Sequence, residues 1–462
     1  MTPDRIEAEA LFHEGNRLAA AGNALGAQSC FRLALLLVPD FGEALANLGL
    51  LREQGGALVE AETCYRKAIA VCPRLLQAYL ILGALLLRGK RFEEAESVNR
   101  QSVQLAPDAP AAWSNLGVLL ACSKREAEAE RCYRTALALD GGYAKARFNL
   151  AYILLRQGRL EEGWACLEER EGYARLNAHF TCPRWRGEAL AGSSLVIGFE
   201  GGLGDMIQFC RYASVLKERG AARISVVCHP ALKTLFATLS GVDAVLSFQD
   251  EVSGADWDFW TPPMSLPHYC HTRLDSIPAP IPYLAPDPGA VARWLTRLPA
   301  SGLRVGLAWK GNASFENDAD RSLPSLDVLA PLGAVAGVRF VSLQKGAGQD
   351  EALRPPLGLA LLALGGELQD FADTAAVVAS LDLVISVDTG VAHLAGSLGT
   401  PCWVLLPDYR TDWRWLTGRT DTPWYPDRMR LFRQPAGGGW AAVVAEVSAA
   451  LARWAGERRG AA

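Results

Sequence analysis

The chain has 462 residues, of which 50% are hydrophobic and 21% are charged, and its formal net charge is −4 at pH 7. This length exceeds what one hydrophobic core normally serves, so we expect two or three domains. The near-neutral charge excludes a broad basic surface for nucleic acid, and no apolar run approaches the ~20 residues of a membrane-spanning helix.

A pattern of small and aromatic residues returns four times near the start of the chain, each copy about 34 residues after the last. The first copy consists of Gly15, Ala27, Phe31, Ala34 and Pro39. This period is the signature of tetratricopeptide repeats, which stack into a superhelix whose concave surface usually binds an extended peptide. A partial fifth unit begins at Asn149 and leaves the pattern after Leu167, as a capping helix would. The sequence therefore predicts a repeat domain over residues 1–175.

The cysteines and the N-terminus both indicate a cytoplasmic protein. The eleven cysteines form no C-x-x-C pair, and Cys30, Cys64 and Cys132 stand in repeat interiors, where a small apolar side chain is needed. The N-terminus lacks the basic-then-apolar layout of a secretion signal. We expect free thiols in a reducing compartment rather than disulfides or a zinc site.

After residue 175, short β-rich segments alternate with helical ones. A Pro-rich stretch, 277–289, separates two such series and predicts an interdomain linker. Strands alternating with helices indicate parallel sheets covered on both faces, and two such domains in tandem place a cleft at the C-terminal ends of the strands. We expect two Rossmann-like domains, over 176–285 and 286–462. The predicted strands are 194–199, 223–228, 244–248, 304–309, 339–343, 383–387 and 402–406.

A glycine turn, Gly201-Gly-Leu-Gly-Asp205, follows the first of these strands and opens a helix predicted over 206–219. Glycines such as Gly202 and Gly204 let a ligand approach the helix N-terminus, where N–H groups and the helix dipole favour negative charge. Asp205 stands where a dinucleotide-binding fingerprint needs a small neutral residue, so this is not that motif. Its carboxylate is either a helix cap or a base facing the cleft, and the sequence favours neither interpretation.

A second loop of this kind is Ser386-Val-Asp-Thr-Gly-Val-Ala-His393, which also follows a predicted strand. Thr389 and Gly390 would place a hydroxyl and backbone N–H groups at a helix start, which suits a diphosphate. Asp388 and His393 would then point toward sugar or ribose hydroxyls. The alternative is an Asp-Thr helix cap with a packed histidine.

Four strings occur together in this chain. They are Gly-Leu-Gly-Asp followed by Ile-Gln-Phe-x-Arg-Tyr, then Leu-Ala-Trp-Lys-Gly-Asn, Ser-Leu-Gln-Lys-Gly, and Asp-Thr-Gly-Val-Ala-His-Leu-Ala-Gly. Together they resemble the heptosyltransferase-related family 9 glycosyltransferases, in particular the bacterial branch with N-terminal tetratricopeptide repeats. The layout is also similar to O-GlcNAc transferase and to flagellin glycosyltransferases with repeats. The resemblance covers essentially the whole chain and implies the two-lobed, metal-independent GT-B fold. In two-lobed sugar transferases a C-terminal helix, here 440–455, often crosses back to the first lobe.

The resemblance also implies roles for single residues. Asp205 would be the catalytic base, and the loop 388–393 would contact the diphosphate and the sugar of the donor. Arg321 and Ser322 match a loop that lies at the cleft. The residues implied to border the phosphate, sugar or nucleotide are Lys310, Gln344, Lys345, Asp388, Thr389, Gly390 and His393.

One string points to a different class of transferase. Asp256-Trp-Asp258 fits the D-x-D pattern that holds a divalent metal. A bare D-x-D often arises by chance, and this one precedes a strand-and-loop stretch, so we expect it to be structural. The charge of the phosphates would instead be met by helix N-termini and by Lys310 or Lys345.

Asparagine recurs at one position of the first helix in several repeats. Asn47, Asn115 and Asn149 share this register with His13 and Ile81. Stacking would place the carboxamides in a row on the concave face, where each can donate to and accept from a peptide backbone. O-GlcNAc transferase, which the layout resembles, uses an asparagine ladder of this kind. The alternative is that each asparagine bonds its own neighbours, and Ile81 interrupts the row.

Taken together, these patterns predict an inverting glycosyltransferase that moves a sugar from a nucleotide-sugar donor to Ser or Thr hydroxyls of a protein acceptor, with a flagellin-like protein as one candidate. The nucleotide-sugar is a substrate, and no metal or other cofactor is expected. Neither nucleic acid nor a membrane span is expected, and an oligomer is left open. Two alternatives remain: a transferase acting on a saccharide or lipopolysaccharide, and a non-catalytic repeat scaffold with a relic transferase domain. The presence of Asp205, Asp388 and His393 counts against the relic.

Overall fold

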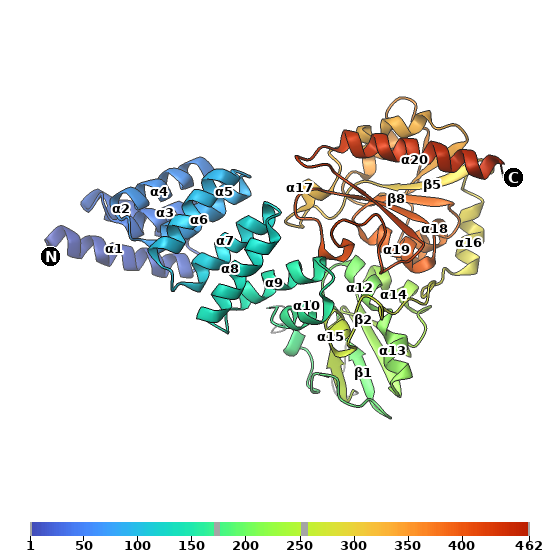
Figure 1. Ribbon diagram of the computed structural model, residues 1–462, viewed down its shortest axis with the longest axis horizontal. Helices are drawn as coiled ribbons and strands as arrows, with labels where there is room; N and C mark the ends of the chain where they lie inside the picture. Colours follow the sequence, from blue (N-terminus) through green and yellow to red (C-terminus); the bar gives the residue numbers. More distant parts are fainter. Residues whose placement is uncertain (1, 171–175, 251–256, 461–462) are drawn as a thin grey trace. The chain divides into compact units, whose positions relative to one another are not determined.

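The computed structural model describes residues 2–170, 176–250 and 257–460 (Figure 1). Contacts along the chain divide it into two compact units, Met1–Ile153 and Leu154–Ala462. No helix within the described ranges is long and apolar enough to cross a membrane.

The first unit is built from helices that pack in consecutive pairs, as the repeat pattern predicts. A glycine in the first helix of a pair lies against a side chain of the second, which is an aromatic ring in three pairs and Asn99 in the third pair. A Cβ on Gly15 would lie 2.6 Å from Phe31 Cε1, and one on Gly49 would lie 2.4 Å from Tyr65 Cε1. A larger residue would push the helices apart, which explains the fixed spacing of the pattern. The helices are α1 (Pro3–Ala20), α2 (Ala24–Leu37), α3 (Gly42–Gln54), α4 (Leu58–Val71), α5 (Leu76–Arg88), α6 (Phe92–Leu105), α7 (Pro110–Cys122), α8 (Glu126–Leu139) and α9 (Ala144–Arg156), which crosses the boundary between the units.

The capping helix α10 (Leu160–Leu167) lies in the second unit. The indole of Trp164 is buried and packs edge-on against Trp413 and Trp424, with ring centroids 5.2 and 6.3 Å away. Its Nε1 donates to the carbonyl oxygen of Thr272 at 3.1 Å. The contacts of α10 are therefore with the α/β part of the chain, which is why the boundary between the units falls before it.

The second unit contains two sheets in which every pairing between named strands is parallel, as predicted. The four-stranded sheet has the order β3-β2-β1-β4 and the six-stranded sheet the order β10-β9-β8-β5-β6-β7. Strands β7 and β10 were not predicted from the sequence, and β4 was predicted only as part of the strand-and-loop stretch after Asp258. The strands are β1 (Ser194–Ile197), β2 (Arg223–Cys228), β3 (Ala244–Ser247), β4 (Phe259–Thr261), β5 (Leu303–Ala308), β6 (Val338–Ser342), β7 (Leu361–Ala363), β8 (Leu383–Val387), β9 (Cys402–Leu406) and β10 (Met429–Arg433).

In both sheets the order in which the chain adds strands reverses at an inner strand, although all the strands are parallel. The chain runs outward from β1 to β2 and β3, and then returns to place β4 on the other side of β1. In the same way it runs from β5 to β6 and β7, and then places β8 on the other side of β5. Ligands of open parallel sheets bind at such a reversal, outside the carboxyl ends of the strands. The loops that follow β1, β4, β5 and β8 are therefore the places to look for a site.

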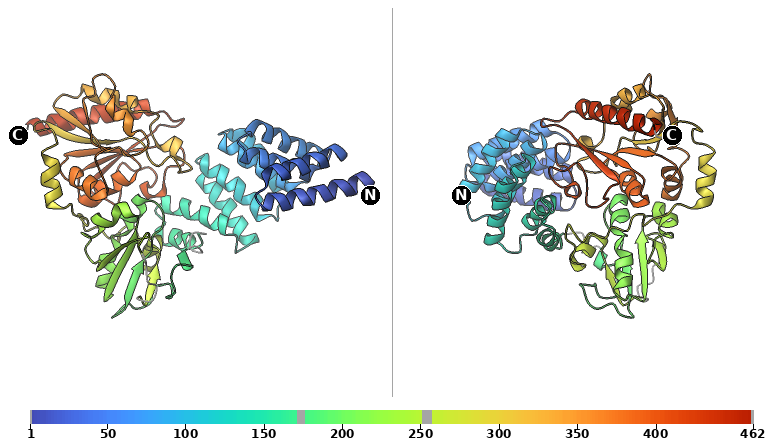
Figure 2. Two further views of the ribbon diagram at one scale, coloured as in Figure 1. Left: turned by 180° about the vertical axis from the view of Figure 1, so that it is seen from behind. Right: turned by 45° about the vertical axis from the view of Figure 1, so that its right-hand side comes forward.

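Helices cover both faces of the six-stranded sheet. Helix α20 (Trp440–Gly460) lies along one face, and α18 (Phe371–Val378) and α19 (Gly390–Leu398) lie on the other (Figures 1 and 2). The apolar side chains of α20 are buried against β5, β8, β9 and the 3-10 helix η3 (Leu326–Ala334). The expectation that this helix crosses back to the first lobe is therefore wrong, because its apolar stripe is already covered by its own sheet. The buried side chains of α20 include those of Trp440, Val443, Val447 and Leu451.

The helix predicted over 206–219 is broken into α12 (Leu203–Phe209) and α13 (Tyr212–Glu218). Arg211 lies in the break with 1% of its surface exposed. Its Nη1 donates to the carbonyl oxygens of Trp424 at 2.7 Å and Pro278 at 3.1 Å, and its Nη2 donates to the Tyr283 hydroxyl at 3.0 Å. Arg211 thus fastens the four-stranded part to the Pro-rich linker and to the segment before β10. The remaining short helices are α14 (Pro230–Phe236), α15 (Leu266–Tyr269), α16 (Pro288–Leu295), α17 (Asp318–Arg321), η2 (Pro263–Ser265), η4 (Gln349–Leu353) and η5 (Trp413–Trp415).

Candidate active site

The two loops singled out in the sequence meet where α12 packs against α19. A Cβ on Gly204 would lie 2.8 Å from His393 Cδ2 and 3.5 Å from the Cα of Gly390. Only glycine permits this close approach, which explains the glycine in the turn. The loops after β1 and β8, far apart in the sequence, therefore form one candidate site at the reversal points of both sheets.

Asp205 lies in the first turn of α12 with 23% of its side chain exposed. Its Oδ2 accepts a hydrogen bond from the backbone N–H of Gly202 at 2.6 Å, so the carboxylate caps its own helix. Its Oδ1 forms an ion pair with Arg414. The cap interpretation is confirmed, and a role as base remains compatible with it because two carboxylate oxygens offer more lone pairs than these contacts use.

Arg414, which the sequence reasoning missed, is 7% exposed and reaches Asp205 from the loop after β9. Its Nε donates to Gln208 Oε1 at 2.6 Å. Its Nη1 donates to both carboxylate oxygens of Asp412 at 3.0 Å. The signal that could have found it is the string Asp412-Trp-Arg-Trp415, which concentrates charge and large aromatics after a strand.

Asp388 follows β8, and 14% of its side chain is exposed. Burial, and then the negative charge of Asp412, raise the pKa of Asp388 to about 6. The nearby guanidinium groups of Arg321 and Arg414 oppose this shift. The Asp388 carboxyl group therefore changes charge close to neutral pH.

His393 is buried, with its Nδ1 hydrogen-bonded to the Tyr425 hydroxyl at 2.9 Å. Its ring stacks on Trp415, with centroids 5.4 Å apart. Burial, and then the positive charge of Arg414, hold the pKa of His393 well below its usual value, so the imidazole is neutral at pH 7. Its Nε2 lies 4.0 Å from Asp388 Oδ1. The structure thus has the packed histidine of the alternative interpretation, with Nε2 directed to the Asp388 side.

We expect Asp388→Asn to raise the stability of the protein above pH 6. A carboxyl group whose folded pKa exceeds its unfolded value binds its proton more tightly when folded, so stability falls as the pH rises from about 4 to about 6. The asparagine variant escapes this loss, on the order of 2–3 kcal/mol at pH 8, and gains nothing below pH 4. Urea unfolding of the two proteins across this range measures the difference. Asp275→Asn, at an exposed carboxylate, is the control and should change neither curve. A variant no more stable than the wild type at pH 8 would contradict the expectation.

Thr389 is the N-cap residue of α19, but its hydroxyl bonds Ser386 Oγ at 2.9 Å instead of a backbone N–H. The N-cap side chain therefore leaves the first N–H groups of the nine-residue helix, beginning at Gly390, uncapped. Such a helix start attracts an anion through those N–H groups and the helix dipole.

Gln344, expected to border the nucleotide, uses both ends of its amide within the protein. Its Oε1 accepts from the backbone N–H groups of Trp309 and Lys310 at 2.9 and 3.0 Å. Its Nε2 donates to the carbonyl oxygens of Lys310 at 3.0 Å and Ala347 at 2.8 Å. The buried amide thus shapes the loop after β5, a role that its place in the sequence does not reveal.

Both lysines expected at the phosphates lie at the carboxyl edge of the six-stranded sheet, and both have partners. Lys310 Nζ forms an ion pair with Glu351 Oε1 at 2.6 Å. Lys345 Nζ donates to the carbonyl oxygen of Leu368. A phosphate would have to share or replace these contacts.

The loop that contains Arg321 and Ser322 packs on the loop after β5. The Arg321 guanidinium pairs with Asp318 at 2.9 Å. The Ser322 hydroxyl accepts from the N–H of Gly311 and donates to Asp318 Oδ1, both at 2.8 Å. Because the charge of Arg321 acts on Asp388, this loop borders the candidate site as expected.

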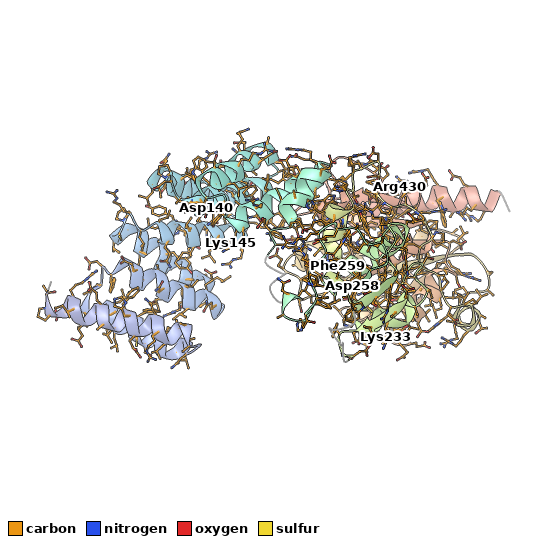
Figure 3. The ribbon with its side chains drawn as sticks, turned by 90° about the horizontal axis from the view of Figure 1, so that it is seen from below. Asp140, Lys145, Lys233, Asp258, Phe259 and Arg430 are labelled. Atoms are coloured by element: carbon orange, nitrogen blue, oxygen red, sulfur yellow. The ribbon has the colours of Figure 1, made fainter. Side chains whose placement is uncertain are left out.

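Asp258 of the D-x-D string directly precedes β4 (Figure 3). It therefore lies at the amino ends of the strands, whereas the candidate loops follow their carboxyl ends. Its Oδ2 accepts from the backbone N–H and the hydroxyl of Ser194 at 2.7 and 2.8 Å, where β1 begins. Asp256 lies outside the described residues. Within the part of the chain that the structure describes, no group of three or more His, Cys, Asp or Glu side chains could hold a metal ion.

The asparagine row is half-buried in the repeats and partly engaged with its neighbours. Asn47 Nδ2 donates to Asn16 Oδ1 at 2.7 Å, and Asn47 Oδ1 accepts from Gln77 at 3.3 Å. Asn115 donates to the carbonyl oxygen of Leu80 at 3.3 Å. Two of the three amides therefore brace adjacent helices, as the alternative interpretation expects, and each amide still has hydrogen-bonding capacity for a peptide.

Comparison with known protein families places both parts of the chain. Residues 343–405 match glycosyltransferase family 9 (heptosyltransferase). Tetratricopeptide repeats match residues 12–75, 60–110, 110–143 and 132–165. The chain is therefore similar to tetratricopeptide repeats in its N-terminal part and to family 9 glycosyltransferases over part of the six-stranded sheet. The family 9 match includes the loop of Asp388 and His393 but ends before Arg414.

Among individual proteins, protein FlbA of Caulobacter vibrioides is 30% identical over 332 residues. The match covers 67% of this chain and 55% of FlbA, so it spans about half the length of that relative. Solved structures are similar to parts of this chain. The thermophilic tetratricopeptide protein TTC0263 of Thermus thermophilus is 26% identical, with a TM-score of 0.33, over 37% of this chain and 96% of its own. PilF of Pseudomonas aeruginosa is 22% identical, with a TM-score of 0.35, over 47% and 88%.

Proposed function

We propose that this protein is an inverting, metal-independent glycosyltransferase of the GT-B type, which moves a sugar from a nucleotide-sugar to a Ser or Thr hydroxyl of a protein held by the repeats. The observation that carries the proposal is the contact between the Asp205 turn after β1 and the Asp388–His393 loop after β8. It joins the reversal points of two parallel sheets, where a donor and an acceptor can meet.

In this proposal Asp205 accepts the proton of the acceptor hydroxyl while the hydroxyl oxygen attacks the anomeric carbon. The bond from that carbon to the donor diphosphate breaks in the same step, so the configuration at the carbon inverts. Negative charge grows on the leaving diphosphate and is stabilised by the start of α19, at Thr389 and Gly390. Lys310 adds a positive charge once its bond to Glu351 is shared with the phosphate.

The repeats supply the argument for a protein acceptor, because stacked repeats of this kind usually bind an extended polypeptide. We further propose that the acceptor is flagellin-like and that the reaction takes place in the cytoplasm. The family name, heptosyltransferase, favours a second candidate in which the acceptor is a saccharide and the repeats only recruit partners.

A panel of sugar nucleotides, each added to the full chain while its melting temperature is recorded, tests the proposal. A donor present at 100 times its Kd stabilises the protein by about 2.7 kcal/mol, which the melting curve resolves. The donor so identified should then be turned over equally well with and without excess EDTA. A panel in which no sugar nucleotide binds would contradict the proposal. Activity lost in EDTA and restored by manganese would contradict the metal-independent part of the proposal.

We expect the triple change of Asn47, Asn115 and Asn149 to Ala to raise the KM for a protein acceptor several-fold and to leave donor affinity unchanged. Each amide contributes on the order of 1 kcal/mol to peptide binding, so a single change is easily masked. The matched control is Asn16→Ala, which removes the partner of Asn47 and lies outside the row. If the control raises the acceptor KM as much as the triple variant, or a folded triple variant has unchanged acceptor kinetics, the row is structural.

A further inference from the structure

Arg414 joins the two sheets of the second unit at Asp205. It stands on η5, between β9 and β10, whereas Asp205 and Gln208 stand on α12 after β1. We propose that Arg414 is a positioning residue for Asp205: Asp412 and Gln208 hold the guanidinium, and the guanidinium holds the carboxylate that receives the acceptor proton. This inference rests on the proposed function and adds to it the group that aims the base.

The guanidinium of Arg414 is held along its edges and lies close to an aromatic ring. Three edges are occupied: Nε by Gln208 at 2.6 Å, Nη1 by both oxygens of Asp412 at 3.0 Å, and Nη2 by Asp205. The guanidinium carbon also lies 4.5 Å from the Trp413 ring centroid. A planar fork held along its edges and against a ring has little rotational freedom, so the carboxylate that it binds is held in one orientation. A lysine ammonium can replace the charge but not this geometry.

Two features beside Arg414 are unfavourable for stability. Gln208 is 0% exposed, yet its Nε2 has no hydrogen-bond partner among the described residues. A buried unpaired N–H is destabilising, and an apolar residue of similar size would avoid it. What the glutamine provides is the Oε1 that accepts from Arg414.

Leu416, immediately after η5, has φ 52° and ψ 174°, a backbone conformation that leucine rarely adopts. Local strain of this kind is typical of segments that are held in place for function.

Asp412 makes no hydrogen bond or ion pair with Asp205 among the described residues, so its contacts reach the base through Arg414, while its charge also acts on Asp388. Its carboxylate also caps η5 by accepting from the N–H of Arg414 at 2.9 Å. The arrangement therefore predicts an order of dependence: Asp412 fixes Arg414, and Arg414 fixes Asp205. Once Arg414 is replaced, the contact between Asp412 and Arg414 can no longer affect Asp205.

Steady-state kinetics of Arg414→Gln, Arg414→Lys and Asp412→Asn in the full chain, with the donor found by the melting panel, test this order. We expect Arg414→Gln to lower kcat by about 100-fold or more while the donor KM stays within about threefold, because a misplaced base slows the chemical step and not donor binding. Arg414→Lys should still lose about tenfold in kcat. Asp412→Asn should lower kcat in the wild-type background and lower it by a much smaller factor when added to Arg414→Gln, where only its effect on Asp388 remains. Arg419→Gln, which breaks an exposed Arg–Asp pair on the same segment, is the control and should leave kcat unchanged.

A folded Arg414→Gln protein with near-normal kcat would overturn the inference, as would Asp412→Asn lowering kcat by the same factor in both backgrounds. If Arg414→Gln does not fold, Arg414→Lys and Asp412→Asn decide the matter in the same assay. A wild-type protein that turns over no sugar nucleotide overturns the proposed function and this inference with it. An active wild type with unaffected variants overturns this inference alone.

Discussion

Replacing Asp205 by Asn should lower glycosyl transfer by about 10²–10⁴-fold while donor binding survives. The change removes a proton acceptor but hardly alters volume. The amide oxygen of asparagine can still accept from Gly202, so the first turn of α12 should remain capped. Transfer rates and the donor-dependent rise in melting temperature, measured on the same preparation, separate catalysis from binding.

The control for this variant is Asp287→Asn, because Asp287 also caps a helix, by accepting from Ala290 at 2.7 Å, and lies at the start of α16 away from the two loops. It should leave transfer intact. Near-normal turnover in a folded Asp205→Asn protein would show that Asp205 is a helix cap and nothing more.

Replacing Arg211 by Met should destabilise the second unit by about 3–5 kcal/mol, the range found when one member of a buried polar cluster is removed. The carbonyl oxygens of Trp424 and Pro278 and the hydroxyl of Tyr283 would lose a donor that holds them together. Methionine fills much of the volume but satisfies none of these oxygens. The effect is measured by urea unfolding followed through tryptophan fluorescence, since Trp424 itself lies in the affected cluster.

Arg219→Met provides the matched comparison. Arg219 also donates to two carbonyl oxygens, those of Tyr269 and Cys270, at 3.0 and 3.1 Å, but it is exposed. Water can replace an exposed donor, so this variant should lose less than about 1 kcal/mol. Equal losses in the two variants would mean that burial of the Arg211 contacts has no special weight.

The features that could be predicted from the sequence are those that depend on residues close together in the chain. The repeat helices follow from the spacing of Gly15, Phe31 and their equivalents, because each glycine lies against the side chain at the same position of the second helix, an aromatic ring in three repeats and an asparagine amide in the third. Most strands followed from continuous apolar runs, which a sheet buried on both faces requires. The strands that were missed are β7, whose apolar run 359–364 consists of leucine and alanine, which favour helices over strands, and β10, an edge strand interrupted by Arg430.

Contacts between distant segments could not be read in this way. Nothing near Asp205 in the sequence indicates that Arg414 faces it, because that depends on how two sheets meet. The Asp-Thr-Gly-Val-Ala-His string is equally compatible with an imidazole in a cleft and one bonded to Tyr425. The error on α20 came from the resemblance and from missing β10, because without that strand the helix lies far in sequence from the last predicted strand, 402–406.

The packing of Trp164 on Trp413 and Trp424 determines where a junction can be placed in a chimeric protein. An engineered chimera that exchanges the whole array up to residue 175 would remove α10 and uncover two indoles beside the segment that carries Arg414. A junction in α9, near residue 153, keeps α10 with the second unit and exchanges only the repeat helices before the junction. Under the proposed function, a chimera meant to bind a new acceptor would exchange the helices before residue 153 and keep α10 with the second unit.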